Sequence, residues 1–170
     1  GAKAEEGADL DSVADVAQRT VEATRSMGVA LTPCTVPAAG RPTFQIEEEE
    51  MEIGMGIHGE PGVRRGPLRT ADQIGEEILE TLLTDMPLVA GDKISLLCNS
   101  LGATPPEELY ITYRYASKKL SDIGVEILMP LVGRYATSME MAGLSLTICK
   151  LDEELERLLK APCNCAFWRV

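Results

Sequence analysis

The residue best suited to chemistry in this chain is its single histidine, His58. Imidazole has an ordinary pKa close to neutral, so it can act there as an acid, a base or a nucleophile. His58 ends an apolar alternation and is followed by Gly59, then by a proline and a glycine that break the chain. This pattern is typical of a side chain that a rigid scaffold presents on a loop. The alternative is a structural histidine, because imidazole is intermediate in its preference for burial.

The sequence around this histidine fits neither of the two common nucleotide-binding motifs. Gly54, Gly56 and Gly59 match the spacing of the dinucleotide fingerprint. That fingerprint needs a helix that begins inside the motif and faces the pyrophosphate, whereas Pro61 and Gly62 interrupt the chain at once. The Gly-Lys-Ser/Thr ending of a phosphate-binding loop does not occur in the sequence. We therefore predict no cofactor-binding residues on this chain.

The five cysteines point to a reducing compartment rather than to a metal site. Their number is odd, and Cys98 and Cys149 lie in apolar runs, where a thiol is usually a small buried hydrophobe. Cys163 and Cys165 lack the two-residue spacer of metal motifs, so we predict no metal ligands. Cys34, in a proline-rich loop, could approach the histidine. A nucleophilic pair would also need an oxyanion-stabilising device, which the sequence does not identify.

Composition excludes two classes of partner. A formal net charge of -11 and a pI near 4.6 oppose nucleic-acid binding, which requires clustered Lys and Arg. No apolar run approaches the roughly 20 residues of a membrane span, and the acidic amino end does not resemble a signal segment, so we expect a cytoplasmic protein. The acidic run 47–50 predicts a solvated turn rather than a calcium site. Because Gly1 is not an initiator methionine, we expect the chain to be part of a longer protein.

Hydrophobic spacing predicts strands that alternate with amphipathic helices. Three-four spacing indicates helices over residues 9–27, 71–86, 105–123 and 152–160, the second of them begun by a capping box of Thr70 and Gln73. Period-two alternation or short apolar runs indicate strands over residues 29–31, 51–57, 93–99, 125–132 and 144–151. The proline-rich residues 32–45 predict a long loop.

These elements predict a single domain over residues 1–170, of α/β (α+β-like) class. It would have two layers, a mixed sheet of about five or six strands with helices packed on it. We expect the strand at 93–99 to deliver Asn99 to its carboxyl end, and an aromatic residue of the tail, Phe167 or Trp168, to pack against the body.

Four blocks of sequence carry a resemblance to a known family. They read Gly-Ile-His-Gly-Glu-Pro-Gly at residues 56–62, Val-Ala-Leu-Thr-Pro-Cys-Thr-Val-Pro-Ala-Ala-Gly at 29–40, Asn-Ser-Leu-Gly-Ala-Thr at 99–104 and Gly-Arg-Tyr-Ala-Thr-Ser-Met-Glu-Met-Ala-Gly at 133–143. In this order they resemble the carboxy-terminal half of the substrate-binding subunit of dihydroxyacetone kinase. The resemblance extends over nearly the whole chain.

The resemblance implies that His58 forms a covalent hemiaminal with the ketone carbon of dihydroxyacetone. A neutral imidazole nitrogen is a nucleophile toward a small activated ketone, and covalent capture excludes glycerol, which has no carbonyl. Glu60 would orient the imidazole ring. The product of the complete kinase would be dihydroxyacetone phosphate.

The same resemblance places other parts of the reaction outside this chain. The acid/base groups would belong to a preceding half of the subunit, and ATP or ADP with magnesium to a separate domain or subunit, so the isolated chain would be inactive. The phosphoryl donor could be ATP or a phosphotransferase relay. A homodimer is expected. A non-catalytic dihydroxyacetone sensor or coactivator of the same family is the alternative, and a scaffold with a structural histidine is a third reading.

Overall fold

A mixed β-sheet organises the computed structural model, which describes residues 1–57, 60–166 and 168–170. Within these residues the sheet has six strands in the order β3-β2-β1-β6-β4-β5. Neighbouring strands are antiparallel except β4 and β5, which are parallel. The strands are β1 (Thr24–Ala30), β2 (Glu50–Ile53), β3 (Arg64–Pro67), β4 (Lys93–Ser100), β5 (Glu126–Gly133) and β6 (Gly143–Lys150). The predicted mixed sheet with helices packed on it is confirmed.

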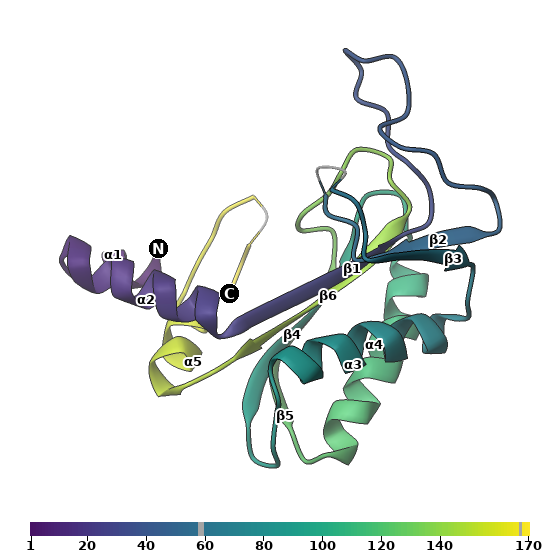
Figure 1. Cartoon of the computed structure of the whole chain (residues 1–170). Coiled ribbons are helices and arrows are strands. Elements are labelled where there is room, and N and C mark those ends of the chain that lie inside the picture. Colours follow the sequence, from purple (N-terminus) through teal and green to yellow (C-terminus); the bar gives the residue numbers. More distant parts are fainter. Residues whose placement is uncertain (58–59, 167) are drawn as a thin grey trace.

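Two long helices, α3 (Ala71–Asp85) and α4 (Pro106–Asp122), pack on one face of this sheet (Figure 1). The main core lies between them and the sheet, where every second residue of a strand points inward. Helix α4 is also the crossover that parallel strands such as β4 and β5 require. Fully buried members of this core include Ile78, Leu96, Leu120, Leu146 and Ile148.

The start of α3 follows the predicted capping box. The Thr70 side chain accepts a hydrogen bond from the Gln73 backbone N–H at 3.3 Å, and the Gln73 side chain accepts one from the Thr70 N–H at 3.2 Å. The helix ends at Asp85, two residues before Pro87, which cannot supply a backbone N–H. The predictions for α4 and for the strands at β4, β5 and β6 are likewise confirmed to within one or two residues at each end.

The helix predicted over residues 9–27 is correct at its start and wrong at its end. Helix α2 (Leu10–Glu22) begins at Asp9, whose carboxylate accepts the Ser12 N–H at 2.8 Å. It stops at Glu22, and residues 24–27 belong instead to β1, in register with residues 146–149 of β6. Pairing with a central strand therefore overrides the helical spacing of these residues, as tertiary context commonly does.

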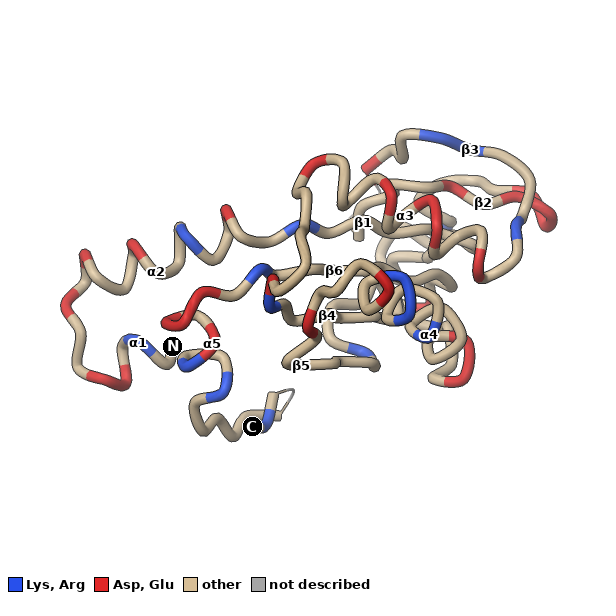
Figure 2. Tube along the Cα trace, turned by 90° about the horizontal axis from the view of Figure 1, so that it is seen from below, with Lys and Arg blue, Asp and Glu red and all other residues tan. Residues whose placement is uncertain are grey.

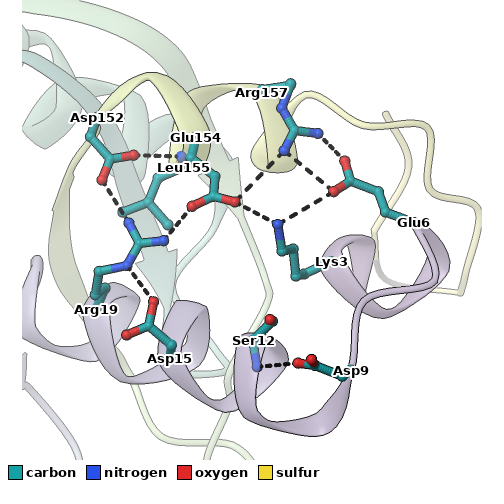
Figure 3. A network of polar contacts seen from close by, with 10 residues as sticks. All are labelled: Lys3, Glu6, Asp9, Ser12, Asp15, Arg19, Asp152, Glu154, Leu155 and Arg157. Atoms are coloured by element: carbon teal, nitrogen blue, oxygen red, sulfur yellow. Dashed lines mark hydrogen bonds and ion pairs between the residues drawn. The ribbon is translucent and has the colours of Figure 1, made fainter.

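Three helices lie together at the end of the molecule that holds both termini: α1 (Ala2–Glu5), α2 and α5 (Glu153–Leu159) (Figure 1). Charged side chains connect them (Figure 3). Lys3 Nζ donates to Glu154 Oε1 at 2.7 Å, and Arg19 donates to Asp152 at 2.9 Å and also pairs with Glu154. These pairs fix α1 and α2 on α5, which was correctly predicted after Asp152.

Other predictions are met at the surface and in the core. Glu47, Glu48 and Glu49 are exposed, as expected for a solvated turn. Cys98 is fully buried, and burial raises the pKa of its thiol to about 12. In the tail, the Trp168 ring meets the Tyr135 ring edge-on at 6.1 Å between centroids, while Phe167 lies outside the described residues. No helix within the described part of the chain is long and apolar enough to cross a membrane.

Candidate functional site

The loop that contains the histidine block connects β2 to β3. Strand β2 ends at Ile53, and Gly54 turns away from it with φ +83°, a conformation that favours glycine. The predicted strand over residues 51–57 is therefore too long. Met51, Ile53 and Met55 are buried, as the alternation predicts, but Ile57 is 36% exposed. The returning strand β3 was not predicted, because its Arg-Arg-Gly-Pro sequence has no apolar alternation.

Backbone hydrogen bonds hold both ends of this loop. The Gly54 N–H donates to the Gly28 carbonyl of β1 at 2.7 Å, and the Val63 N–H donates to the Ile53 carbonyl at 2.8 Å. Both ends of the loop are thus bonded to the neighbouring strands β1 and β2. His58, the predicted nucleophile, lies outside the described residues, as does Gly59.

Glu60, the predicted orienting residue, lies across this loop. The Gly56 N–H donates to the Glu60 carbonyl at 3.3 Å, and a Cβ atom at position 56 would collide with the Glu60 carboxyl group. The side chain therefore folds back over the Gly56 backbone. This explains why the histidine block begins with a glycine: the space that a side chain at position 56 would need is occupied by the Glu60 carboxylate of the same loop.

A cavity of about 430 Å³ lies beside the first half of the loop. Its floor is the face of the sheet opposite α3 and α4, here called the far face, where small polar residues and glycine lie beside Leu97, and the lining as a whole is mostly apolar. The volume lies within the roughly 300–1,000 Å³ usual for small-molecule sites. The Ser26 and Thr147 hydroxyls are 2.7 Å apart on this floor. The lining from the sheet includes Ser26, Gly28, Asn99, Ser145 and Thr147, and the loop adds Gly54, Met55, Gly56 and Ile57.

Asn99, expected at the carboxyl end of its strand, is found there and is only 2% exposed. Its Oδ1 accepts the backbone N–H groups of Tyr135 at 2.8 Å and Ala136 at 3.0 Å. Its Nδ2 donates to the Ala136 carbonyl at 2.7 Å and to Ser145 Oγ at 3.3 Å. These four bonds use the amide fully, so Asn99 holds the loop after β5 against the cavity rather than offering a free group.

The four sequence blocks converge at one end of the sheet (Figure 1). Cys34 Sγ in the long loop lies 3.3 Å from Ser138 Oγ, and the Thr35 N–H donates to Glu140 Oε1 at 2.8 Å. A Cβ atom at Gly102, where φ is +153°, would collide with the Met139 carbonyl. The loops following β1, β4 and β5 are therefore in direct contact. Cys34 is buried, and its approach to the histidine, a possibility that the sequence did not favour, is not tested because His58 lies outside the described residues.

The sequence did not single out Glu52 and Arg65, which lie beside the returning end of the loop. Glu52 is a carboxylate only 6% exposed, and Gly62 donates to its Oε1 at 2.7 Å. Arg65 donates to Glu52 Oε2 through Nε at 3.0 Å and through a terminal nitrogen at 2.5 Å. Figure 2 shows the basic positions of β3 close to acidic positions of β2 and α3. One signal was available, an acidic residue inside an apolar alternation.

The described residues do not fit a metal-nucleotide group. They bring no three His, Cys, Asp or Glu side chains together in a way that could hold a metal ion. Nor do they supply a phosphate-binding loop, whose glycine-rich backbone and lysine would cradle the phosphates.

Comparison with known proteins finds relatives that match this chain over nearly its whole length, including the four blocks. Residues 1–167 match the Dak1 domain family. The chain is 45% identical over 98% of its length to the dihydroxyacetone-binding subunit DhaK of PTS-dependent dihydroxyacetone kinase 2 from Listeria innocua, covering 50% of that protein. It is 45% identical over 99% of its length to L-erythrulose kinase from Pectobacterium atrosepticum, covering 29% of that protein.

A solved structure gives the same result in three dimensions. The dihydroxyacetone kinase operon co-activator DhaQ superimposes with a TM-score of 0.86 and 31% identity, over 94% of this chain and 50% of that one. The chain thus spans half or less of the length of these proteins. Because the family match extends over nearly every residue, this chain belongs to the Dak1 domain family.

Proposed function

We propose that this chain binds dihydroxyacetone covalently, through a hemiaminal with His58, for phosphorylation by a complete dihydroxyacetone kinase. The observation that carries the proposal is the loop that begins at Gly54 and returns at Val63, bonded at both ends beside a mostly apolar cavity with a few polar groups on the far face. A relative 45% identical to this chain is named as a dihydroxyacetone-binding subunit, which supports the choice of ketone.

The chemistry is an addition without a leaving group. An unprotonated imidazole nitrogen donates its lone pair to the ketone carbon, and the electron pair of the carbonyl π bond moves to oxygen. The oxygen takes up a proton and the other ring nitrogen gives one up, so the adduct has the summed mass of protein and triose. We propose that Glu60, folded over Gly56, orients the ring for this step.

The remaining parts of the reaction are assigned elsewhere. ATP or ADP with magnesium would bind a separate domain or subunit, because in-line phosphoryl transfer needs positioning and charge neutralisation that the described residues do not supply. The chain spans about half of its DhaK relative, and we propose that the other half contributes acid/base groups. A homodimer and a separate phosphoryl-donor subunit complete the proposed kinase, in which the isolated chain is inactive.

The direct test is intact-mass measurement under non-denaturing conditions after incubation with dihydroxyacetone. We expect one triose adduct on the wild-type chain, none on His58→Ala and none with glycerol, which lacks a carbonyl. Erythrulose is included because another relative is an L-erythrulose kinase; preferential capture of erythrulose would reassign the substrate. An unmodified wild-type mass, also with the remaining half of a DhaK-type subunit added in trans, contradicts covalent capture.

A sensor is the second candidate function, because the co-activator DhaQ has a TM-score of 0.86 with this chain. A sensor would retain covalent capture but would not hand the triose to a phosphoryl donor. The two functions separate when the phosphoryl-donor partner of a related kinase is added and triose phosphate is measured. Turnover supports the kinase, whereas an adduct without any triose phosphate at saturating donor supports the sensor.

A further inference from the structure

A buried carboxylate, Glu52, pairs with the exposed side chain of Arg65 next to the returning end of the histidine loop. Glu52 is on the short strand β2, opposite Ala30 of β1, and its carboxylate is almost completely withdrawn from solvent. Buried carboxylates are uncommon because removing a charge from water is unfavourable unless it is paired and hydrogen-bonded. Here both requirements are met, by the side chain of Arg65 and by the backbone of Gly62.

The Gly62 backbone lies so close to the Glu52 side chain that there is no room for a side chain at position 62. A Cβ atom at this position would lie 2.5 Å from the Ile53 carbonyl oxygen and 2.6 Å from Glu52 Cγ. The chain that returns from the histidine therefore rests directly on the Glu52 side chain. A larger residue at position 62 would lift the end of the loop away from the carboxylate.

Glu52 thereby completes a set of three anchors around the loop. Gly54 is held by the Gly28 carbonyl, Val63 by the Ile53 carbonyl and Gly62 by the Glu52 carboxylate. The first two anchors are bonds between backbone groups and use no side chain. The third depends on a side chain, and Arg65 on the partner strand fixes the orientation of that side chain through two N–H donors.

We propose that Glu52, held by Arg65, is a positioning residue that anchors Gly62, where the chain returns from His58, so that His58 can capture a ketose. The inference rests on the proposed function and adds the device that keeps the nucleophile in place. Reacting groups must be held close to their productive geometry, and support by neighbouring side chains commonly provides this.

The charge of Glu52 is consistent with such a support. Burial by itself raises the pKa of this carboxyl group, but hydrogen bonds from Arg65 and from the Gly62 N–H, together with the positive charge of Arg65, lower it overall. The carboxylate is thus ionised at neutral pH, the form in which it accepts from both partners at once.

The test compares Glu52→Gln with Glu77→Gln in the full chain. Glu77 on α3 is a matched control, because its carboxylate pairs with Arg64, a neighbour of Arg65 on β3, and with Arg69, and both partners lie outside residues 54–62. Adduct formation with dihydroxyacetone is followed by intact mass over a range of concentrations. We expect Glu52→Gln to slow capture roughly tenfold or more, since a displacement of about 1 Å can lower a rate about a hundredfold.

The control Glu77→Gln should keep a capture rate close to that of the wild type, even if its melting temperature falls as much as that of Glu52→Gln. Arg65→Ala should slow capture as Glu52→Gln does, and the double variant should be no slower than either single variant, because both changes remove one interaction. Wild-type capture by Glu52→Gln, or equal slowing by Glu77→Gln, would overturn the proposal.

Amide hydrogen exchange, measured without any ketose, separates this inference from the proposed function. Exchange over residues 54–63 should accelerate in Glu52→Gln but not in Glu77→Gln. If the wild-type chain forms no adduct, the proposed function fails, and faster exchange in Glu52→Gln would still support Glu52 as the anchor of the loop. Unchanged exchange in this segment would overturn the anchor whatever the result with ketose.

Discussion

At the scale of single residues, two carboxylates in this chain have the same kinds of hydrogen-bond partner. Glu52 and Asp92 each accept from one backbone N–H and from one basic side chain. Glu52 anchors the histidine loop, whereas Asp92 ties the turn before β4 to the end of β6 through Lys150. A hydrogen bond to a charged group is stronger than one between neutral groups, so each carboxylate can fix a turn that has few apolar contacts.

The Asp92 anchor predicts a pH-dependent stability. Asp92 Oδ2 accepts Lys150 Nζ at 2.8 Å and the Val89 N–H at 2.9 Å, and these bonds and the lysine charge hold the pKa of its carboxyl group below the ordinary value. We expect Asp92→Asn to reduce the free energy of unfolding by about 1 kcal/mol at neutral pH, because the pair is partly exposed.

The sign of the pH effect follows from linkage. A carboxyl group whose folded pKa is lowered stabilises the protein fully above its unfolded pKa, and this contribution is lost as the pH falls through the folded pKa. Urea unfolding of wild type and Asp92→Asn should therefore converge in acid. A difference that stays constant as the pH falls, or grows, is incompatible with this account of Asp92.

At the scale of elements, local signals and tertiary pairing compete, and α2 and α3 show the two outcomes. The capping box of Thr70 and Gln73 starts α3 where the sequence predicts. The apolar spacing of α2 continues past Glu22, yet the residues after it join β1 because β6 offers a full set of backbone partners. Side-chain caps thus set the start of α2 and of α3, whereas strand pairing sets the end of α2.

The cap of α3 gives a prediction at this scale. Thr70→Ala removes the acceptor for the Gln73 N–H, and loss of such a cap typically lowers stability by about 1 kcal/mol. Thr81→Ala is the control, since Thr81 is exposed in the same helix and its hydroxyl donates only to the Glu77 carbonyl; we expect a change within about 0.5 kcal/mol. Urea denaturation of both variants measures the difference, and equal effects would argue against the capping box as a stabilising feature.

At the scale of the whole molecule, β6 joins the parts of the fold. It lies between β1 and β4, so it connects the hairpin with the histidine loop to the parallel strands and their crossover helix (Figure 1). Its inward residues Leu144, Leu146 and Ile148 belong to the main core, and its outward residues Ser145 and Thr147 line the cavity. One strand therefore supports the core on one face and the candidate site on the other.

This double role predicts that truncating a buried side chain of β6 strongly reduces the free energy of unfolding. Leu146 is fully buried, and truncation of a buried leucine to alanine lowers the free energy of unfolding by about 2–5 kcal/mol through lost burial and a residual cavity. Leu10→Ala, a matched change at a side chain that is 81% exposed, should stay within about 0.5 kcal/mol. Thermal or urea unfolding distinguishes them; similar losses in both variants would contradict the assignment of the core.

The sequence by itself determined the α/β class, most element positions, the long loop and the four blocks that point to the family. These features depend on local rules: hydrophobic period, caps, and glycine or proline at turns. The same local reading identified His58 as a candidate, and the resemblance to the family added Glu60; the chemical roles of both stay predictions.

Only the tertiary structure decided how these pieces act together. The end of α2 and the cavity on the far face arise from contacts between segments far apart in the chain, and the strand β3 and the burial of Glu52 arise when the β2–β3 hairpin closes. Strand pairing and charge burial depend on which partner is brought close, and a partner across the sheet leaves no periodic mark in the local sequence. Glu52 is the clearest case, because its partners at positions 62 and 65 become neighbours only when the hairpin closes.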